Sequence, residues 1–276
     1  MARYIIAVSG GVDSVALLDM MARQLEHDVV VAHVDHGIRP DSFSDARFVA
    51  KLARSYRLPF ETVRYELGPN ASEEKARLAR YDFLRQVARK HGATVVTAHH
   101  SDDVIESIAI HVSRGTGWRG LATHQSDIAR PLLGVNKDKL QHYAKRNGLK
   151  WREDSTNHTD AYLRNRIRRQ LAALPAEHKD ALLALRRSQI IYRQAIEAEV
   201  KQVIGDGPHY SRYFFAHVPP MVASECLRTI SGARLTRPQR ERALHAIKTA
   251  VPGAQLEAGS GVTLHFTTRQ FSVALL

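Results

Sequence analysis

Short runs of apolar, largely β-branched residues alternate with longer stretches of helical periodicity along the first half of the chain. This alternation is typical of parallel strands joined by crossover helices. We expect strands at 4–8, 29–33, 60–65 and 94–98, and helices at 14–25, 44–56, 72–91 and 103–113. The pattern predicts a doubly wound, mostly parallel α/β sheet, in which ligands bind beyond the carboxyl ends of the strands.

The second half of the chain has a different texture. We expect a helix near 138–147, a basic segment at 163–169 and a long helix from 174 to about 203. Beyond a Gly- and Pro-rich stretch at 205–208, two helices (220–230 and 237–250) and a terminal hairpin (255–275) are expected. These features predict a large α/β domain at 1–185, a helical linker at 186–207 and a smaller basic α+β domain at 208–276.

Charge and cysteine content limit the possible functions. The chain has 40 Lys and Arg against 28 Asp and Glu, a net charge of +12, so its field should attract polyanions such as RNA. A solvated basic face is the alternative interpretation. The single cysteine, Cys226, excludes intramolecular disulfides, paired redox cysteines and cysteine-rich metal or iron-sulfur sites. No stretch approaches the ~18 apolar residues of a membrane span, so we expect a cytoplasmic protein without a membrane partner.

The segment AVSGGVDS joins the first expected strand to the first expected helix. Ser9, Gly10 and Gly11 precede a helix that opens at Asp13 and Ser14, which places bare N–H groups and two hydroxyls where the helix favours an anion. The Walker pattern and G-x-G-x-x-G are both absent. A glycine turn that only permits a tight corner is the alternative, but the surrounding serines and aspartate favour a phosphate cradle.

Histidines and carboxylates gather where two of the expected strands end, and they should converge on one cleft. They are His33, Asp35, His36, His99, His100, Asp102, Asp103 and Glu106. Carboxylates beside a triphosphate are best interpreted as Mg²⁺ ligands and as partners for a cationic substrate. Histidines that form hydrogen bonds in loops are commoner than a zinc cluster. Asp102 and Asp103 also suit the N-cap and first turn of a helix.

Two groups of side chains could contact RNA. The segment 164–169 carries four arginines, and Arg164 and Arg168 share one helical face. In a chain of this net charge, a phosphate-contacting stripe is favoured over a solvated face. The aromatic residues of the C-terminal part could stack on bases, although packing in the core is the more common role. They are Tyr210, Tyr213, Phe214 and Phe215.

The motif around the first turn resembles the signature S-G-G-x-D-S of the PP-loop ATP pyrophosphatases. The resemblance implies an adenine nucleotide alpha hydrolase-like fold and cleavage of ATP between its α and β phosphates, while the turn holds the departing pyrophosphate. It also implies that Asp13 and Asp103 serve a magnesium ion. The nucleotide-binding residues would be Ala7, Val8, Ser9, Gly10, Gly11, Asp13, Ser14, His33 and His99.

Within that superfamily the sequence is similar to the tRNA(Ile)-lysidine synthetases. The similar blocks lie at 32–46, 73–84, 97–121, 130–133 and 151–168. The resemblance implies an enzyme that uses ATP and Mg²⁺ to attach L-lysine to C2 of the wobble cytidine in tRNA(Ile) with a CAU anticodon. The sequence departs from the family at Val104, where glutamine is usual. Whether the protein forms a homodimer cannot be decided from the sequence.

The resemblance also suggests roles for individual residues. The candidate catalytic residues are Asp35, Asp102, Asp103, Glu106 and Arg114. The candidate RNA-binding residues are Arg77, Arg80, Arg164, Asn165, Arg168 and Arg169. One of the aspartates Asp35, Asp102 and Asp103 would hold the lysine amine and accept its proton.

Two other classes of function remain as alternatives. One is a different PP-loop activity, such as tRNA thiolation or ligation of a small-molecule amide. Thiolation that depends on C-x-x-C pairs is disfavoured by the single cysteine. The other is a noncatalytic RNA-binding scaffold, which would have no need of a phosphate turn.

Overall fold

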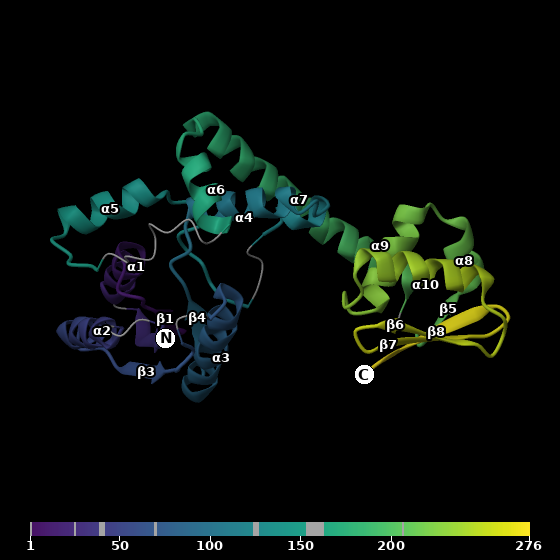
Figure 1. Ribbon diagram of the computed structural model, residues 1–276, viewed down its shortest axis with the longest axis horizontal. Helices are drawn as coiled ribbons and strands as arrows, with labels where there is room; N and C mark the ends of the chain where they lie inside the picture. The colour runs from purple at the N-terminus through teal and green to yellow at the C-terminus, as the bar shows by residue number, and fades with distance from the viewer. Residues whose placement is uncertain are drawn as a thin grey trace. The chain divides into compact units, whose positions relative to one another are not determined.

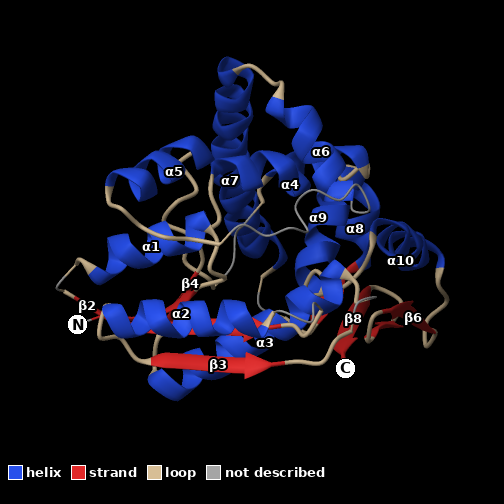
Figure 2. Cartoon of the chain, turned by 60° about the vertical axis from the view of Figure 1, so that its left-hand side comes forward, coloured by secondary structure: helices blue, strands red, loops and turns tan. Residues whose placement is uncertain are grey.

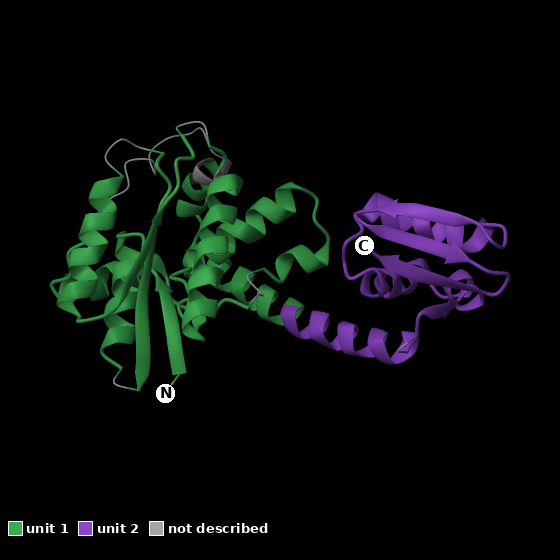
Figure 3. Ribbon diagram, turned by 90° about the horizontal axis from the view of Figure 1, so that it is seen from below, with its two compact units in different colours: residues 1–189 green, residues 190–276 purple. Residues whose placement is uncertain are grey.

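The computed structural model describes residues 2–24, 26–38, 42–68, 71–123, 127–152, 163–205 and 207–276. It divides into two compact units, residues 1–189 and 190–276 (Figure 3). The first unit ends at Gln189, inside the long helix α7 (Ala176–Ile204). Each unit contains one sheet, and the two units are described separately.

Unit 1 is built on a parallel sheet. Its strands are β1 (Ala2–Ala7), β2 (His27–Asp35), β3 (Phe60–Arg64) and β4 (Thr94–Val96), in the order β3-β2-β1-β4. In the central strand, Ile6 lies opposite Val31 of β2 and Val96 of β4. The predicted parallel α/β sheet is therefore confirmed.

Helices cover both faces of this sheet, which explains the continuous apolar runs in its strands. Ile6, Val31 and Val96 pack with α1, α2 and α5, whereas their neighbours Ile5, Val30 and Val95 pack with α3 on the other face. Figure 1 shows α1 and α2 on one side of the strands and α3 on the other, and Figure 2 shows α5 beside α1. The helices of unit 1 before α7 are α1 (Val12–Ala22), α2 (Phe43–Ser55), α3 (Glu73–His91), α4 (Ser101–Ser113), the 3-10 turn η1 (Trp118–Leu121), α5 (Lys137–Arg146) and α6 (Leu163–Ala172).

A buried carboxylate holds three of these helices together. Asp19 of α1 is fully buried and accepts hydrogen bonds from the hydroxyls of Tyr56 (2.5 Å) and Tyr143 (2.6 Å). Tyr56 follows α2, and Tyr143 belongs to α5. Arg23 adds an ion pair to Asp19 at 2.8 Å. The helix that begins at the phosphate turn is thereby fixed to both of its neighbours.

Unit 2 carries an antiparallel sheet in the order β5-β8-β7-β6, with helices on one face (Figure 1). The expected terminal hairpin is wrong, because 255–275 forms three strands. The polar segment 267–269 makes a second turn, in which Thr267 N–H donates to Gln270 O at 2.8 Å. The elements are β5 (His209–Ser211), α8 (Arg212–His217), α9 (Pro220–Ile230), α10 (Arg237–Thr249), β6 (Gln255–Gly259), β7 (Val262–Phe266) and β8 (Gln270–Leu275).

The aromatic residues of unit 2 divide between core and surface. Phe215 is buried and packs edge-on against Phe271, with ring centres 5.1 Å apart. Tyr210 contacts the same ring at 5.6 Å. The expectation of core packing is therefore right for Phe215 and Tyr210, but it is wrong for Tyr213, which is 73% exposed. The short helix α8 turns Tyr213 outward because Phe215 occupies its inner face.

Candidate functional site

The strand order places a change of direction at β1. The chain continues from β1 to β2 and β3 on one side, and β4 then pairs with the other side of β1. In an open parallel sheet, ligands bind at such a switch point, beyond the carboxyl ends of the two strands concerned. The segments that leave β1 and β4 at this point are 9–14 and 97–103, which contain the predicted phosphate turn and most of the predicted acidic residues.

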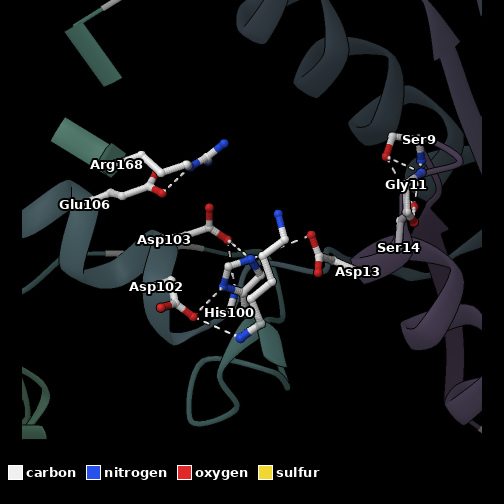
Figure 4. Close-up of polar contacts among 10 residues, drawn as sticks. Ser9, Gly11, Asp13, Ser14, His100, Asp102, Asp103, Glu106 and Arg168 are labelled. Atoms are coloured by element: carbon white, nitrogen blue, oxygen red, sulfur yellow. Dashed lines mark hydrogen bonds and ion pairs between the residues drawn. The ribbon is translucent and has the colours of Figure 1, made fainter. Parts of the chain in front are cut away.

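The turn after β1 offers donors to an anion at the start of α1. Gly11 is the N-cap and provides no side chain, so the first N–H groups of the helix stay available. Ser14 Oγ donates to Gly11 O (2.9 Å) and lies 3.2 Å from Ser9 Oγ (Figure 4). Gly10 has a φ of +95°, a value that favours glycine. The geometry suits a phosphate group.

Arg152 closes one side of the turn from a distant part of the chain. Its N–H donates to Gly10 O at 2.9 Å, and its guanidinium pairs with Asp45 of α2 at 2.6 Å. The Gly10 carbonyl is thus satisfied by the protein. Sequence reasoning did not single out Arg152, and the only signal that could have found it is its place in the similar block at 151–168.

His100 joins the turn after β1 to the start of α4. Its Nε2 lies 3.6 Å from Asp13 Oδ2 and 3.5 Å from Asp103 Oδ2, and its Nδ1 lies 3.5 Å from Asp102 Oδ2. The ring is buried at the centre of the three carboxylates (Figure 4). His100 thus links Asp13, which follows β1, to Asp102 and Asp103, which follow β4; the predicted convergence named His100, Asp102 and Asp103 but not Asp13.

The charges in this cluster follow from its contacts. Burial alone would lower the pKa of His100, but Asp102, Asp13 and Asp103 raise it to about 10, so the ring is positively charged at neutral pH. The adjacent His100 ring lowers the pKa of Asp102 to about 2 against the effect of burial, and the hydrogen bond from the N–H of Lys137 at 2.9 Å contributes. Asp102 is consequently a weak base that fastens α4 to the start of α5.

Asp35 lies at the end of β2 and pairs with Arg64 of β3 at 2.9 Å. Burial would raise the pKa of its carboxyl, but the nearby Ser42 hydroxyl, the hydrogen bond from the N–H of Gly37 and the charge of Arg64 hold the pKa below its usual value. Gly37 has a φ of +61°, and a Cβ there would meet Tyr65 O at 2.3 Å. The backbone after β2 is thus fixed so that it supports the Asp35 carboxylate.

Glu106 lies one turn beyond Asp102 and Asp103 on α4, and a cation of α6 covers it. Arg168 Nε donates to Oε1 at 2.5 Å and Nη2 donates to Oε2 at 3.2 Å (Figure 4). The Glu106 side chain is 3% exposed, whereas that of Arg168 is 38% exposed. The pair therefore anchors α6 on α4 while part of the guanidinium remains accessible to a ligand.

The histidines predicted to bind nucleotide fill supporting positions. His33 is buried, and its Nδ1 lies 2.8 Å from Val8 O, at the end of β1. Burial lowers the pKa of His33, which keeps the ring neutral at neutral pH. His99 Nδ1 lies 2.8 Å from Thr97 Oγ1. Within the described residues, no group of three or more His, Cys, Asp or Glu is arranged to hold a metal ion.

The remaining predicted site residues lie on other parts of the chain. Arg114 is exposed at the C-cap of α4, the end of the helix opposite to Asp102 and Asp103, about 17 Å along the axis. Arg77 and Arg80 lie over the ring of Tyr81 on α3, and burial together with the charge of Arg80 lowers the pKa of His36 to about 4. The side chains of Arg164 and Asn165 lie outside the described residues.

Val104 occupies a core position. It is fully buried on the face of α4 away from the carboxylates. Ile105 and Ile108 of the same helix are also buried. An apolar side chain needs no hydrogen-bond partner there, so valine suits this buried position.

Comparison with known proteins agrees with this site. The chain matches the family model for the PP-loop domain over residues 1–174. Together with the parallel sheet and the phosphate turn, this match shows that the chain belongs to the PP-loop family. In the described part of the chain, every helix is too short or too polar to cross a lipid bilayer.

Several relatives carry one name. The tRNA(Ile)-lysidine synthase of Thermotoga maritima is 31% identical over 233 residues, covering 78% of this chain and 56% of that protein. The protein of that name from Thermus thermophilus is 33% identical over 283 residues, covering 94% and 56%. The one from Geobacter sulfurreducens is 40% identical over 184 residues, covering 61% and 39%. The chain spans about half the length of the relatives that it matches.

A solved structure shares the fold at low sequence identity. The U34-tRNA thiolase NcsA from Methanococcus maripaludis, with its [4Fe-4S] cluster, aligns with a TM-score of 0.56 and 17% identity. The alignment covers 68% of this chain and 70% of that chain. It supports the fold of the chain and does not define its chemistry.

Proposed function

We propose that this protein is a ligase that uses ATP to attach L-lysine to C2 of the wobble cytidine of tRNA(Ile) with a CAU anticodon. The reaction would pass through an adenylated cytidine and release AMP and pyrophosphate. One observation carries the proposal: His100 joins a phosphate turn to the acids of α4, in a chain that is 33% identical over 94% of its length to a tRNA(Ile)-lysidine synthase. A reaction on tRNA with ATP would take place in the cytoplasm.

The phosphate turn would hold the leaving group. Pyrophosphate gains negative charge as the bond between the α and β phosphates breaks, and donors fixed before the reaction stabilise that charge. The N–H groups at the start of α1 and the hydroxyls of Ser9 and Ser14 are fixed in this way by the bonds between Ser14, Gly11 and Ser9. Uncharged donors suit a site from which the product must depart.

Magnesium fits beside this turn. Asp13 Oδ1 is buried and, within the described part of the chain, accepts no hydrogen bond. Mg²⁺ takes one or two carboxylates together with phosphate oxygens, so Asp13 with Asp103 would suffice as protein ligands. The ion, when bound, would offset the charge of the phosphates. His100 keeps the two carboxylates near each other by lying 3.6 Å from Asp13 and 3.5 Å from Asp103.

The lysine must lose a proton from its ε-ammonium before it attacks the cytidine. Asp102 and Asp35 have lowered pKa values and fixed partners, which makes them poor proton acceptors. Asp103 also has fixed partners, because it accepts a hydrogen bond from the N–H of His100 at 3.0 Å and lies 3.5 Å from the His100 ring, so all three aspartates would hold cations rather than accept the lysine proton. Asp35 can still hold a cationic group as an ion-pair partner, in competition with Arg64. Arg168 would use its exposed edge to orient phosphate or cytidine.

tRNA thiolation with a bound cluster is disfavoured for this chain. Protein ligands to a [4Fe-4S] cluster are mainly cysteine thiolates, and the printed sequence has only Cys226, which is buried in unit 2. A nucleophile other than sulfide is therefore expected at the activated base. Lysine, whose amine is such a nucleophile, fits this expectation. Unit 2 carries a net positive charge, so the segment 208–276 is a candidate contact surface for tRNA.

Incorporation of labelled lysine into an unmodified tRNA(Ile) transcript with a CAU anticodon tests the proposal. The assay includes ATP and Mg²⁺, and methionine tRNA, which has the same anticodon, is the control. We expect label in the isoleucine tRNA alone, with release of AMP and pyrophosphate. Asp103→Asn should abolish incorporation, while Asp138→Asn, at an exposed acid of α5, should leave it unchanged. Cleavage of ATP to AMP without incorporation of lysine would refute the proposed substrate.

A further inference from the structure

A hollow of about 590 Å³ lies in unit 2, and the residues that line it come from the start of α8, the end of α10 and the turn before β8. Its lining includes Arg212, Tyr213, Lys248 and Arg269. The size is within the range of small-ligand sites. No acidic side chain is among the described residues that line it.

Arg212 builds the floor of this hollow. Its guanidinium donates to the carbonyls of Ile247 (2.7 Å), Ala250 (2.7 Å) and Thr267 (2.8 Å). The first two carbonyls lie at the end of α10, where helix geometry leaves acceptors without intrahelical donors. Arg212 therefore holds α8, α10 and the turn before β8 in a fixed arrangement, so the walls exist before any ligand arrives.

Two further cations remain available at the rim. Lys248 and Arg269 are exposed, and in the part of the chain that the structure describes neither forms an ion pair. Two cations without a neighbouring carboxylate attract an anion such as a phosphodiester. The charges of Lys248 and Arg269 are thus not neutralised by a carboxylate of the described part of unit 2.

Tyr213 forms one wall. Its ring stacks on His217 with centres 4.0 Å apart and planes at 28°, and His217 Nδ1 lies 2.8 Å from Tyr213 O. His217 does not line the hollow, whereas Tyr213 does. One side of the tyrosine ring is therefore supported by His217, and the ring remains 73% exposed. A supported and exposed aromatic ring is a suitable platform for a nucleobase.

We propose that this hollow binds one unpaired nucleotide of RNA, with the base stacked on Tyr213 and the phosphate held by Lys248 and Arg269. The inference rests on the proposed function only in taking RNA as the ligand. A base inside a duplex has both faces covered, so the hollow selects single-stranded RNA or an unpaired end over paired RNA.

Fluorescence anisotropy of the full chain with labelled oligoadenylate tests the inference, with the same strand paired to oligouridylate as a comparison. Tyr213→Ala should weaken binding of the single strand between about 5-fold and 100-fold, since stacking has that strength. Tyr213→Phe should bind like the unmodified protein. Tyr192→Ala, which removes another exposed tyrosine of unit 2 (59% exposed), is the matched control.

The salt dependence separates stacking from charge. The double variant with Lys248→Gln and Arg269→Gln should reduce the slope of log affinity against log salt by about 0.7, while Tyr213→Ala should leave the slope unchanged. Lys201→Gln, at an exposed position of α7, is the control for a general loss of charge. Far-UV circular dichroism of each variant confirms that it is folded.

Two results would overturn the inference: Tyr213→Ala binding as tightly as Tyr192→Ala, or Tyr213→Phe binding as weakly as Tyr213→Ala. Either result together with normal lysine incorporation would leave the proposed function standing. RNA binding that depends on Tyr213, in a protein that incorporates no lysine, would support the hollow and refute the proposed function.

Discussion

Replacing Asp19 by asparagine should destabilise unit 1 strongly, although the change removes only a charge. Asp19 is fully buried and accepts hydrogen bonds from Tyr56 and Tyr143 at 2.5 and 2.6 Å. A hydrogen bond to a charged group contributes ~1.5–3 kcal/mol, so the two tyrosines account for ~3–6 kcal/mol. The asparagine oxygen can keep one neutral bond of ~1 kcal/mol, which leaves an expected loss of about 2–5 kcal/mol. Arg23 is assigned no share because it can turn to water.

Urea unfolding followed by tryptophan fluorescence measures this loss for unit 1 alone. The two tryptophans of the chain, Trp118 and Trp151, both belong to unit 1, so the signal does not report unit 2. Asp28→Asn is the control, since the pair of Asp28 with Arg3 is exposed on both sides and such pairs contribute ~0–1 kcal/mol. The double variant of Asp19→Asn with Tyr143→Phe should be less destabilised than the sum of the single variants.

The effect of Asp19→Asn should also depend on pH. Burial would raise the pKa of Asp19, but the hydrogen bonds from Arg23, Tyr143 and Tyr56 lower it overall. The contribution of the carboxylate is therefore complete above the unfolded pKa of about 3.9 and is lost as the pH falls through the folded pKa. The difference in unfolding free energy between the unmodified protein and Asp19→Asn should be constant near neutral pH and shrink below about pH 4. An Asp19→Asn protein as stable as Asp28→Asn at neutral pH would refute this account of the buried network.

Gly37→Ala should lower the stability of unit 1 by more than about 3 kcal/mol in the same fluorescence assay, because its Cβ would lie 2.3 Å from Tyr65 O. Gly68→Ala, with a φ of +78° and open space around it, should lose only about 1–2 kcal/mol, and equal losses would contradict the steric explanation. Glu106→Gln should reduce kcat/KM for lysine incorporation at least ~10-fold, because Arg168 loses its buried partner; an unchanged value would remove Glu106 from the site. Cys226 is fully buried, and burial raises the pKa of its thiol, so iodoacetamide should leave it unmodified in the folded protein and alkylate it in urea. Rapid alkylation of the folded protein would show that α9 opens easily.

The parallel sheet could be predicted because its strands are buried on both faces. Val29, Val30 and Val31 form a run with no polar interruption, and the structure places alternate members in two different cores. The same pattern placed the phosphate turn and the acids after 94–98 beyond the carboxyl ends of strands, whereas the order of the strands, and with it the switch point, came from the structure. Local sequence was sufficient to predict the location of a residue where that location follows from the strand to which the residue belongs or which it follows.

Contacts that depend on distant segments could not be predicted in this way. Nothing in the spacing of residues shows that Arg168 covers Glu106, or that His100 rather than His99 lies among the carboxylates. The third strand at the end of unit 2 was missed because Thr267, Thr268 and Arg269 make a turn without glycine or proline. The exposure of Tyr213 depends on which face of a helix of six residues meets the core, and so short a helix has almost no periodicity to read.

The bond from Arg152 to Gly10 has a consequence for the order of events during synthesis. The phosphate turn is synthesised well before Arg152, so one of its carbonyls acquires its protein partner only after Arg152 has emerged from the ribosome. The strand β4 and the acids of α4 also come much later in the chain than β1. The nascent chain therefore contains the phosphate turn well before it contains the other residues of the site. Contacts of such large sequence separation form late in folding. Closure of the site around the phosphate turn thus depends on segments that span most of unit 1.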